Sequence, residues 1–232
     1  MAGLITHMVI AREIIGRLPK GTISDPGIFY LGNLAPDSIH ARDGYIRAYK
    51  KHTHMRDDIP DIDFNAEENR QLFHRRVADF ILENRNRPLP ELDLYRGYVV
   101  HILADELFML TIRNEFCDTM EQLGIAQDNP LFFKYIVDDM NRNDYLLIDQ
   151  YEGSKEIQVN LETVRIYPVA GYLSEQEIRI SRDWLLRQHF YQENGLLNPR
   201  YISKKRMWDY IQLAADQIVW RLSGEGDFPK ML

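Results

Sequence analysis

The sequence predicts an all-α protein, and three observations carry this prediction. Apolar residues recur every three or four positions along most of the chain, which is the periodicity of amphipathic helices. Only residues 156–168 alternate in part, and they fit either a short strand or a helix. The length of 232 residues, with no internal repeat and no Gly/Ser-rich linker, suits one hydrophobic core. We therefore expect a single domain over residues 1–232.

The first expected helix covers residues 5–18, with Thr6 as its N-cap. Its apolar face is formed by Ile5, Met8, Ile15 and Leu18. Gly21 and Pro26 then interrupt the chain before the stretch IFYLGNLAPD, which is expected to end in a loop at Asp37.

The middle of the chain contains the longest apolar pattern. A basic helix is expected over residues 40–50, and a loop over residues 51–63, which include Pro60 and four aspartates. An amphipathic helix over residues 66–85 follows. Residues 92–117 are apolar almost all round, which predicts a central helix buried on most sides. Further helices are expected near residues 129–149, 174–191 and 203–222.

The composition narrows the class of protein. A formal net charge of -7 argues against a nucleic-acid partner, because phosphate backbones bind lysine and arginine. The sequence contains no run of about 18 apolar residues, so no transmembrane segment is expected. The first residues lack the basic stretch and cleavage site of a secretory signal, so we expect a cytoplasmic protein. Cys117 is the only cysteine, which excludes an internal disulfide and a thiolate metal cluster.

Two polar residues interrupt the central apolar helix. His101 and Asp105 are four positions apart and therefore share one helix face, which also carries apolar residues and should point inward. A carboxylate that is buried in an apolar core, with no cation or hydrogen bond to compensate its charge, costs roughly several kcal/mol. A divalent cation bound by both side chains would compensate it, and so would an internal His–Asp hydrogen bond in a packed core. The spacing alone leaves both interpretations open.

Other candidates precede this helix in the sequence. His7 lies near the apolar face of the first helix, where a histidine packed in the core is the simpler interpretation. Asp37 follows a proline, as turn and capping aspartates often do. His52 and His54 are two positions apart, which suits an extended loop in which both side chains point the same way.

The remaining histidines are expected at the surface. His40 and His74 have basic or polar neighbours. His189 and Glu193 are four positions apart, and we interpret them as an exposed polar pair at a helix end.

Taken together, these segments resemble the zinc-dependent phospholipase C family, whose fold the S1/P1-type nucleases resemble. The similarity covers about the first half of the chain and is closest to small bacterial members without a secretion signal. The matching segments are THMVIA (6–11), FYLGNLAPDS (29–38), KKHTHMRD (50–57) and YRGYVVHILADELF (95–108).

The resemblance implies an all-helical fold with zinc ions in a cleft. It implies that His7 binds one zinc, and that Asp37, a loop histidine and His101 bind another. Asp105 would bridge the two ions, and Asp37 could also orient or deprotonate a water. The loop histidine of the family precedes a bulky apolar residue and soon an aspartate, which favours His54 as the ligand. His52 is then a neighbour of the ligands or an alternative ligand.

The sequence also departs from the family pattern. The segment ELFMLTIRNEF after Asp105 lacks the histidine that the family uses for a third zinc, so we expect a two-zinc centre. The family also uses its α-amine as a ligand, and the amine of Met1 or Ala2 could serve here. The expected substrate is a small phosphoester or a phospholipid.

Two other functions are consistent with parts of the sequence. A nucleotide phosphohydrolase of the HD type needs an adjacent His-Asp pair, and none of the seven histidines is followed by aspartate. A non-enzymatic relative could use a metal only to hold a helical core together. The oligomeric state is not predicted.

Overall fold

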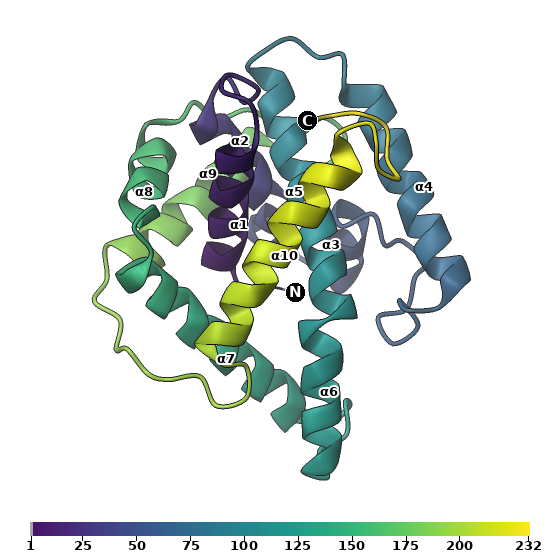
Figure 1. Ribbon diagram of the computed structural model, residues 1–232, viewed down its shortest axis with the longest axis vertical. Helices are drawn as coiled ribbons and strands as arrows, with labels where there is room; N and C mark the ends of the chain where they lie inside the picture. Colours follow the sequence, from purple (N-terminus) through teal and green to yellow (C-terminus); the bar gives the residue numbers. More distant parts are fainter. Residues whose placement is uncertain (1) are drawn as a thin grey trace.

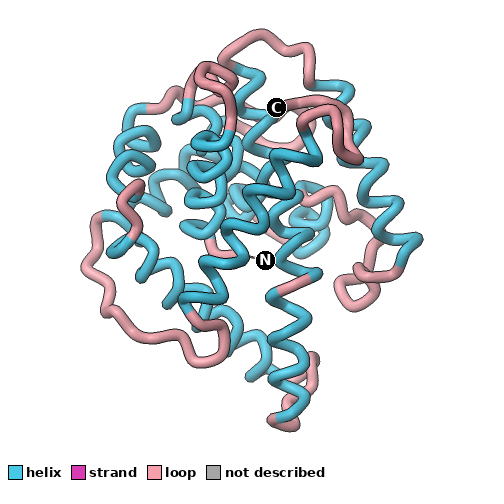
Figure 2. The backbone as a smooth tube through the Cα atoms, in the orientation of Figure 1, coloured by secondary structure: helices cyan, strands magenta, loops and turns pink. Residues whose placement is uncertain are grey.

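The computed structural model describes residues 2–232, and it confirms the all-α prediction. The backbone alternates between helices and loops throughout this part of the chain (Figure 2). Over residues 2–232 the only β-type pairing is an isolated bridge between Val169 and Leu173. No helix of the described chain is both long and apolar enough to cross a membrane.

The helices follow one another with short connections. The α-helices are α1 (Leu4–Arg17), α2 (Pro26–Leu34), α3 (Arg47–Thr53), α4 (Glu67–Asn84), α5 (Glu91–Leu110), α6 (Ile112–Gln122), α7 (Pro130–Gln150), α8 (Ser154–Thr163), α9 (Glu175–Leu185) and α10 (Lys204–Leu222). A 3₁₀ helix (Ala35–Ala41) follows α2, and a π-helical turn (Leu186–Phe190) follows α9.

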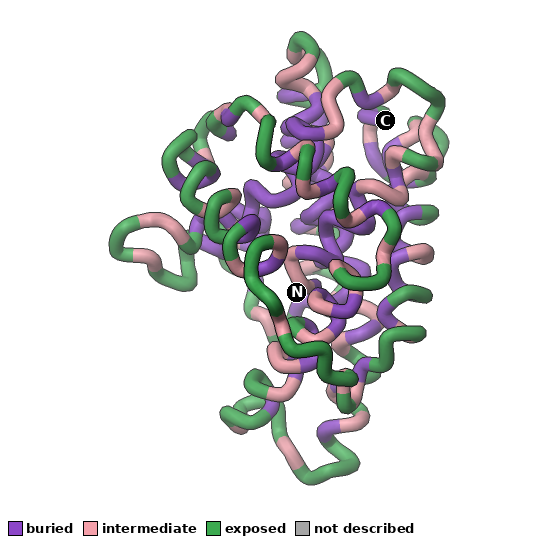
Figure 3. The backbone as a smooth tube through the Cα atoms, turned by 90° about the vertical axis from the view of Figure 1, so that its left-hand side faces the viewer, coloured by how far each residue is buried: buried purple, intermediate pink, exposed green. Residues whose placement is uncertain are grey.

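Helix α5 runs through the middle of the molecule and contacts α1, α2, α4 and α10 (Figure 1). Helix α6 continues beyond the end of α5 and projects from the body. One cluster of buried apolar residues extends from Ala2 to Leu232, and the buried segments lie inside a shell of exposed ones (Figure 3). The segment with the longest apolar pattern in the sequence therefore contains the helix against which α1, α2, α4 and α10 pack.

Two glycines let α2 and α5 approach each other at backbone distance. A Cβ atom on Gly32 would lie 1.9 Å from the carbonyl oxygen of Leu94, and one on Gly97 would lie 2.1 Å from that of Phe29. No side chain fits at such distances, so both positions require glycine. This contact matters for the site because it brings the end of α2 beside His101.

The structure changes several element boundaries. The pattern over residues 92–117 is two helices, since the chain departs from helical geometry at Thr111 (φ -119°, ψ -86°). The stretch expected only to lead into a loop is helix α2, which begins at Pro26. The expected basic helix over residues 40–50 starts later, at Arg47, and runs into the predicted loop. The ambiguous segment 156–168 is helical up to Thr163.

Candidate metal centre

His7 enters the centre from the first turns of α1. The predicted N-cap is wrong, because the helix starts at Leu4 and Gly3 is the N-cap. The free N–H groups of this helix end are bound by Asp144 of α7, which accepts from Ile5 N at 3.0 Å, Thr6 N at 3.0 Å and Thr6 Oγ1 at 2.8 Å. A carboxylate from another helix thus does the capping, and it fixes the end of α1 that carries His7.

Asp37 and His54 come from two adjoining short elements. Asp37 belongs to the 3₁₀ helix after α2, and His54 is the C-cap of α3. Thr53 Oγ1 donates to the carbonyl oxygen of Pro36 at 2.9 Å, which ties the two elements together beside the site. Oδ1 of Asp37 lies 3.5 Å from Nε2 of His54.

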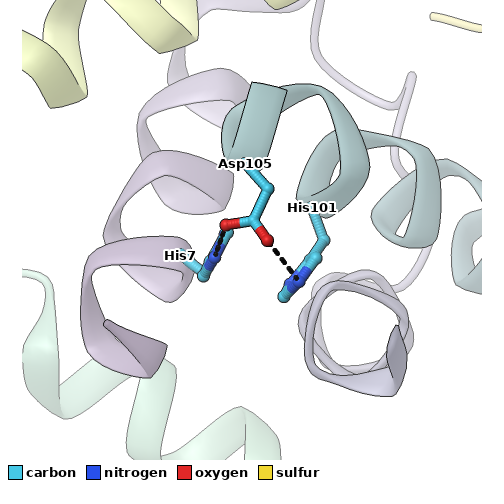
Figure 4. Close-up of side chains that lie close together, drawn as sticks. All are labelled: His7, His101 and Asp105. Carbon is cyan, nitrogen blue, oxygen red and sulfur yellow. Dashed lines mark ion pairs between the residues drawn. The ribbon is translucent and has the colours of Figure 1, made fainter. Parts of the chain in front are cut away.

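His101 and Asp105 lie one turn apart on α5 and are buried. The carboxylate of Asp105 lies between two histidines, with Oδ1 3.2 Å from Nε2 of His7 and Oδ2 3.9 Å from Nε2 of His101 (Figure 4). Oδ2 is also 3.6 Å from Nε2 of His54. The side chains therefore converge from α1, α3 and α5 on one carboxylate.

Backbone carbonyls fix the orientation of two imidazoles. Nδ1 of His101 lies 2.7 Å from the carbonyl oxygen of Asn33, and Nδ1 of His54 lies 2.9 Å from that of Lys50. Because a carbonyl only accepts, each Nδ1 carries the hydrogen and each Nε2 presents a lone pair. The two Nε2 atoms are 3.3 Å apart and face each other. Two lone pairs at this distance repel, and a shared cation would remove the repulsion.

Several other polar atoms of the cluster also lack a hydrogen-bond partner. Both ring nitrogens of His7 and Oδ2 of Asp105 are buried and have no such partner among residues 2–232. Oδ1 of Asp105 accepts from Ala2 N at 3.1 Å, so the start of the chain lies against the cluster. The proposed role of the Met1 amine lies outside the described residues.

The surroundings favour the protonation states of metal ligands. Burial would raise the pKa of Asp37, but Lys50 and His54 hold that pKa well below its usual value. Burial acts in the same direction on Asp105, yet its pKa is also held well below its usual value, and His7 and His101 are among the groups that lower it. Burial lowers the pKa of His54, and burial together with the charge of His7 lowers the pKa of His101. The carboxylates are therefore charged and these two imidazoles neutral at neutral pH.

Lys50 is a member of the site that the sequence did not single out. This lysine is only 3% exposed, and its ammonium forms an ion pair with Oδ1 of Asp37 and lies 3.1 Å from Nε2 of His40. Its position in the sequence, within a run of basic residues, indicated a solvated helix end. No local pattern distinguishes this lysine from its exposed neighbours.

The donor set fits a cation. Two groups of buried ligands have all their donor atoms within 4.8 Å of one another: His7, His101 and Asp105 form one, and Asp37, His54 and His101 the other. These are the five residues that the sequence suggested as ligands. Lys50 forms an ion pair with Asp37, whereas the close partners of the Asp105 carboxylate are histidines, so a cation would supply the charge that Asp105 lacks. Nitrogen and carboxylate oxygen are ordinary ligands of divalent metals.

The other histidines lie elsewhere. His52 is outside the cluster, with its ring half exposed, 2.9 Å from Asp57 and stacked on Tyr172. His40 is exposed, as predicted. His74 was expected at the surface, but its Nε2 lies 2.5 Å from the buried carboxylate of Glu106, because the edge of α4 faces α5.

The prediction for His189 and Glu193 is wrong. The helix ends at Phe190, so the two residues do not share a face, and only Glu193 is exposed. His189 is 6% exposed, lies close enough to Asp144 for their charges to interact, and has an Nδ1 without a partner among residues 2–232.

A cleft of about 460 Å³ opens beside the cluster. Its lining includes Ala2, Gly3, Arg56 and Asp61, and it reaches α6, α7 and the end of α9. Arg56 also lines two small cavities, one shared with His54 and one shared with His54 and Asp105. The cleft therefore adjoins the candidate ligands.

Comparisons with models of protein families, with characterised proteins and with solved structures find no match for this chain.

Proposed function

We propose that this chain is a metal-dependent hydrolase of phosphoesters, with a two-zinc centre similar to that of zinc-dependent phospholipase C. One observation carries the proposal. Five residues that are widely separated in the sequence lie together in the core with their donor atoms facing one another. Helix packing alone gives no reason to gather three imidazoles and two carboxylates at one buried point.

The proposed ligands divide between two ions. His7 would hold one ion, and Asp37, His54 and His101 the other. His101 has only Nε2 to offer, because its Nδ1 is engaged by Asn33. Asp105 has two oxygens, one toward His7 and one toward His54 and His101, so the carboxylate is the better bridge. When bound, a metal pair of this kind lowers the pKa of a water and polarises a phosphoryl oxygen.

Two side chains of the protein, Asp37 and Lys50, would act on the proton of the attacking water and on the charge of the phosphoryl group. Asp37 is held in its ionised form by Lys50, so it can orient a water or accept a proton at Oδ1. The ammonium of Lys50, already paired with that oxygen, would lie beside the charge that develops on the phosphoryl group. The adjoining cleft would admit the substrate and keep bulk water away from the reaction.

The proposal is tested by metal content and activity together. We expect two zinc ions per chain by elemental analysis and hydrolysis of bis(p-nitrophenyl) phosphate. His101→Ala and Asp105→Asn should each lower the rate at least about 100-fold. His52→Ala is the matched control, because this exposed histidine lies outside the cluster, and it should keep both metal and rate. A protein that stays free of metal after incubation with zinc would overturn the proposal.

The depth at which the cluster is buried favours a second function, in which the metal has a structural role only. The four ligands other than Asp37 are at most 5% exposed, which suits a metal that only holds α1, α3 and α5 together. In that case chelation lowers the melting temperature, while the clean protein hydrolyses no phosphoester tested. Metal-dependent turnover that is lost in Asp105→Asn would exclude this alternative.

A further inference from the structure

The cleft beside the cluster contains arginines that the proposed hydrolysis does not use. Arg47, Arg56 and Arg113 all line it. They come from α3, from the loop after α3 and from α6, so the fold brings them together from separate parts of the chain. Because all three line one cleft, their guanidinium groups lie around the same space.

These positive charges are only partly neutralised. The carboxylate of Asp61 is shared, 2.5 Å from Nη2 of Arg47 and 3.0 Å from Nη2 of Arg56. Arg113 donates to the uncharged side chain of Gln127 at 3.3 Å. Asp144 is the other carboxylate of the lining, so three arginines face two carboxylates. The lining of the cleft therefore keeps an excess of positive charge within an acidic chain.

Arg56 also has a donor without a partner. It is 7% exposed, and its Nε finds no acceptor among residues 2–232. A buried donor without an acceptor costs free energy, and an incoming anion would satisfy it. The planar fork of arginine matches two phosphate oxygens, so phosphate is the anion that suits these groups best.

Much of the remaining cleft lining is apolar. It consists of Met109, Phe132, Phe133, Ile136, Val137, Met140 and Trp184. Phe133 is 70% exposed and Trp184 is 43% exposed, so both offer ring surface to a bound molecule. A free phosphate ion would leave these apolar residues uncovered, whereas a phosphorylated molecule with an apolar part would contact them and the arginines.

We propose that the substrate is a phosphoester that carries a second phosphate, which Arg56 and Arg113 bind while the ester phosphate faces the metal ligands. This inference rests on the proposed function, because only a hydrolase of phosphoesters would use the bound phosphoester as its substrate. The second phosphate is a monoester, and it can belong to a soluble molecule or to a lipid headgroup.

Binding is measured first, without reference to turnover. Isothermal titration of the purified protein with pyrophosphate should give saturable binding, weakened about tenfold or more in Arg113→Gln. Arg56→Lys keeps the charge but loses the fork, and it should weaken binding as well. Arg179→Gln, an exposed arginine of α9, is the matched control and should bind as the parent does. Vesicles with a phosphate-monoester headgroup identify the lipid source; binding to either probe supports the site, and binding to neither overturns it.

Turnover then separates this inference from the proposed function. We compare kcat/KM for an aryl phosphodiester with and without an added phosphate group. The ratio of the two values should favour the phosphorylated substrate and should fall about tenfold in Arg113→Gln. An unchanged ratio in a variant that still turns over refutes the second phosphate and leaves the hydrolase intact. If the zinc-loaded parent protein hydrolyses no phosphoester but still binds pyrophosphate, the hydrolase is refuted and the anion site remains.

Discussion

Lys50 and Asp37 form a buried ion pair in which each charge depends on the other. Lys50→Met removes the ammonium and leaves a carboxylate in the core, so we expect it to destabilise the fold by about 3 kcal/mol. Added zinc should recover part of this loss, because a cation at Asp37 replaces the missing charge. Thermal unfolding with zinc and with a chelator measures both effects.

The matched control for that variant is Lys205→Met. Lys205 is 84% exposed and pairs with Asp209 at 2.7 Å on the surface of α10, so its removal should cost less than about 1 kcal/mol. Equal losses for Lys50→Met in zinc and in chelator would show that Asp37 does not face a metal.

The positions of individual site residues could be predicted from the sequence where their spacing placed them on the same face of a helix. His101 and Asp105 are four positions apart, so their shared face followed directly from helix geometry. The choice of His54 over His52 came from the family pattern, and the structure brings only His54 into the cluster. Lys50 and His189 could not be predicted, because their burial depends on segments that are distant in the chain.

Helices α2 and α5 depend on glycine at their crossing. Gly97→Ala would place a methyl group 2.1 Å from the carbonyl oxygen of Phe29, so the helices must separate. We expect a loss of about 3 kcal/mol, at the upper end of overpacking, because backbone cannot rearrange as a side chain does. Separation would also withdraw the carbonyl of Asn33 from His101, so zinc affinity should fall as well. Denaturant unfolding and zinc titration measure the two effects.

Gly16→Ala provides the control at the same scale. Gly16 also lies within a helix, and a Cβ there would meet no atom within 4 Å. Alanine should therefore stabilise α1 by about 1 kcal/mol. If Gly97→Ala behaved like Gly16→Ala, the close approach of α2 to α5 would be refuted.

Glu177, in the first turn of α9, should make a contribution to the stability of the fold that is lost in acid. Burial would raise the pKa of Glu177, but hydrogen bonds from Arg42 at 2.5 Å and from Ser174 at 2.7 Å and 2.8 Å lower it. An acid with a lowered folded-state pKa stabilises the fold above its unfolded-state pKa, and this stabilisation disappears as the pH falls through the folded-state pKa.

Glu177→Gln tests this contribution because glutamine can keep the capping box with Ser174 and loses only the charge. We expect it to cost about 1 kcal/mol near neutral pH and to be nearly neutral at pH values below the folded-state pKa. Free energies of unfolding across the acid range give both values. A cost that does not change with pH would assign the effect to packing.

Helical periodicity predicted the long elements and missed the short ones. Helices α4, α7 and α10 have apolar faces long enough to show the period, and their bounds lie close to those expected. Helix α2 is a short segment whose residues from Gly27 to Leu34 are all buried, so it shows no polar face and no period. Pro26 was interpreted as a break, although proline is also common at the first position of a helix.

At the scale of the whole molecule, the cluster joins segments that are far apart in the sequence. His7 belongs to the N-terminal helix, Asp37 and His54 to the short elements after α2, and His101 to the central helix. Periodicity predicted the helices of His7 and His101, but the crossing of α2 and α5 depends on contacts such as Gly32 with Leu94, which have no signature in the local sequence.

Metal removal should therefore loosen particular parts of the molecule. A ligand that binds only the folded protein stabilises it by about 2.7 kcal/mol at 100 times its Kd, which corresponds to roughly 100-fold slower exchange of amides that open with the site. Chelation should raise hydrogen exchange at the start of α1 and over residues 35–59. Exchange in α8 should stay the same, because this helix contributes no ligand. His54→Ala should show the faster exchange even in zinc, whereas His52→Ala should match the parent. Uniformly faster exchange after chelation would mean that the metal stabilises the fold as a whole and does not tie these elements to α5.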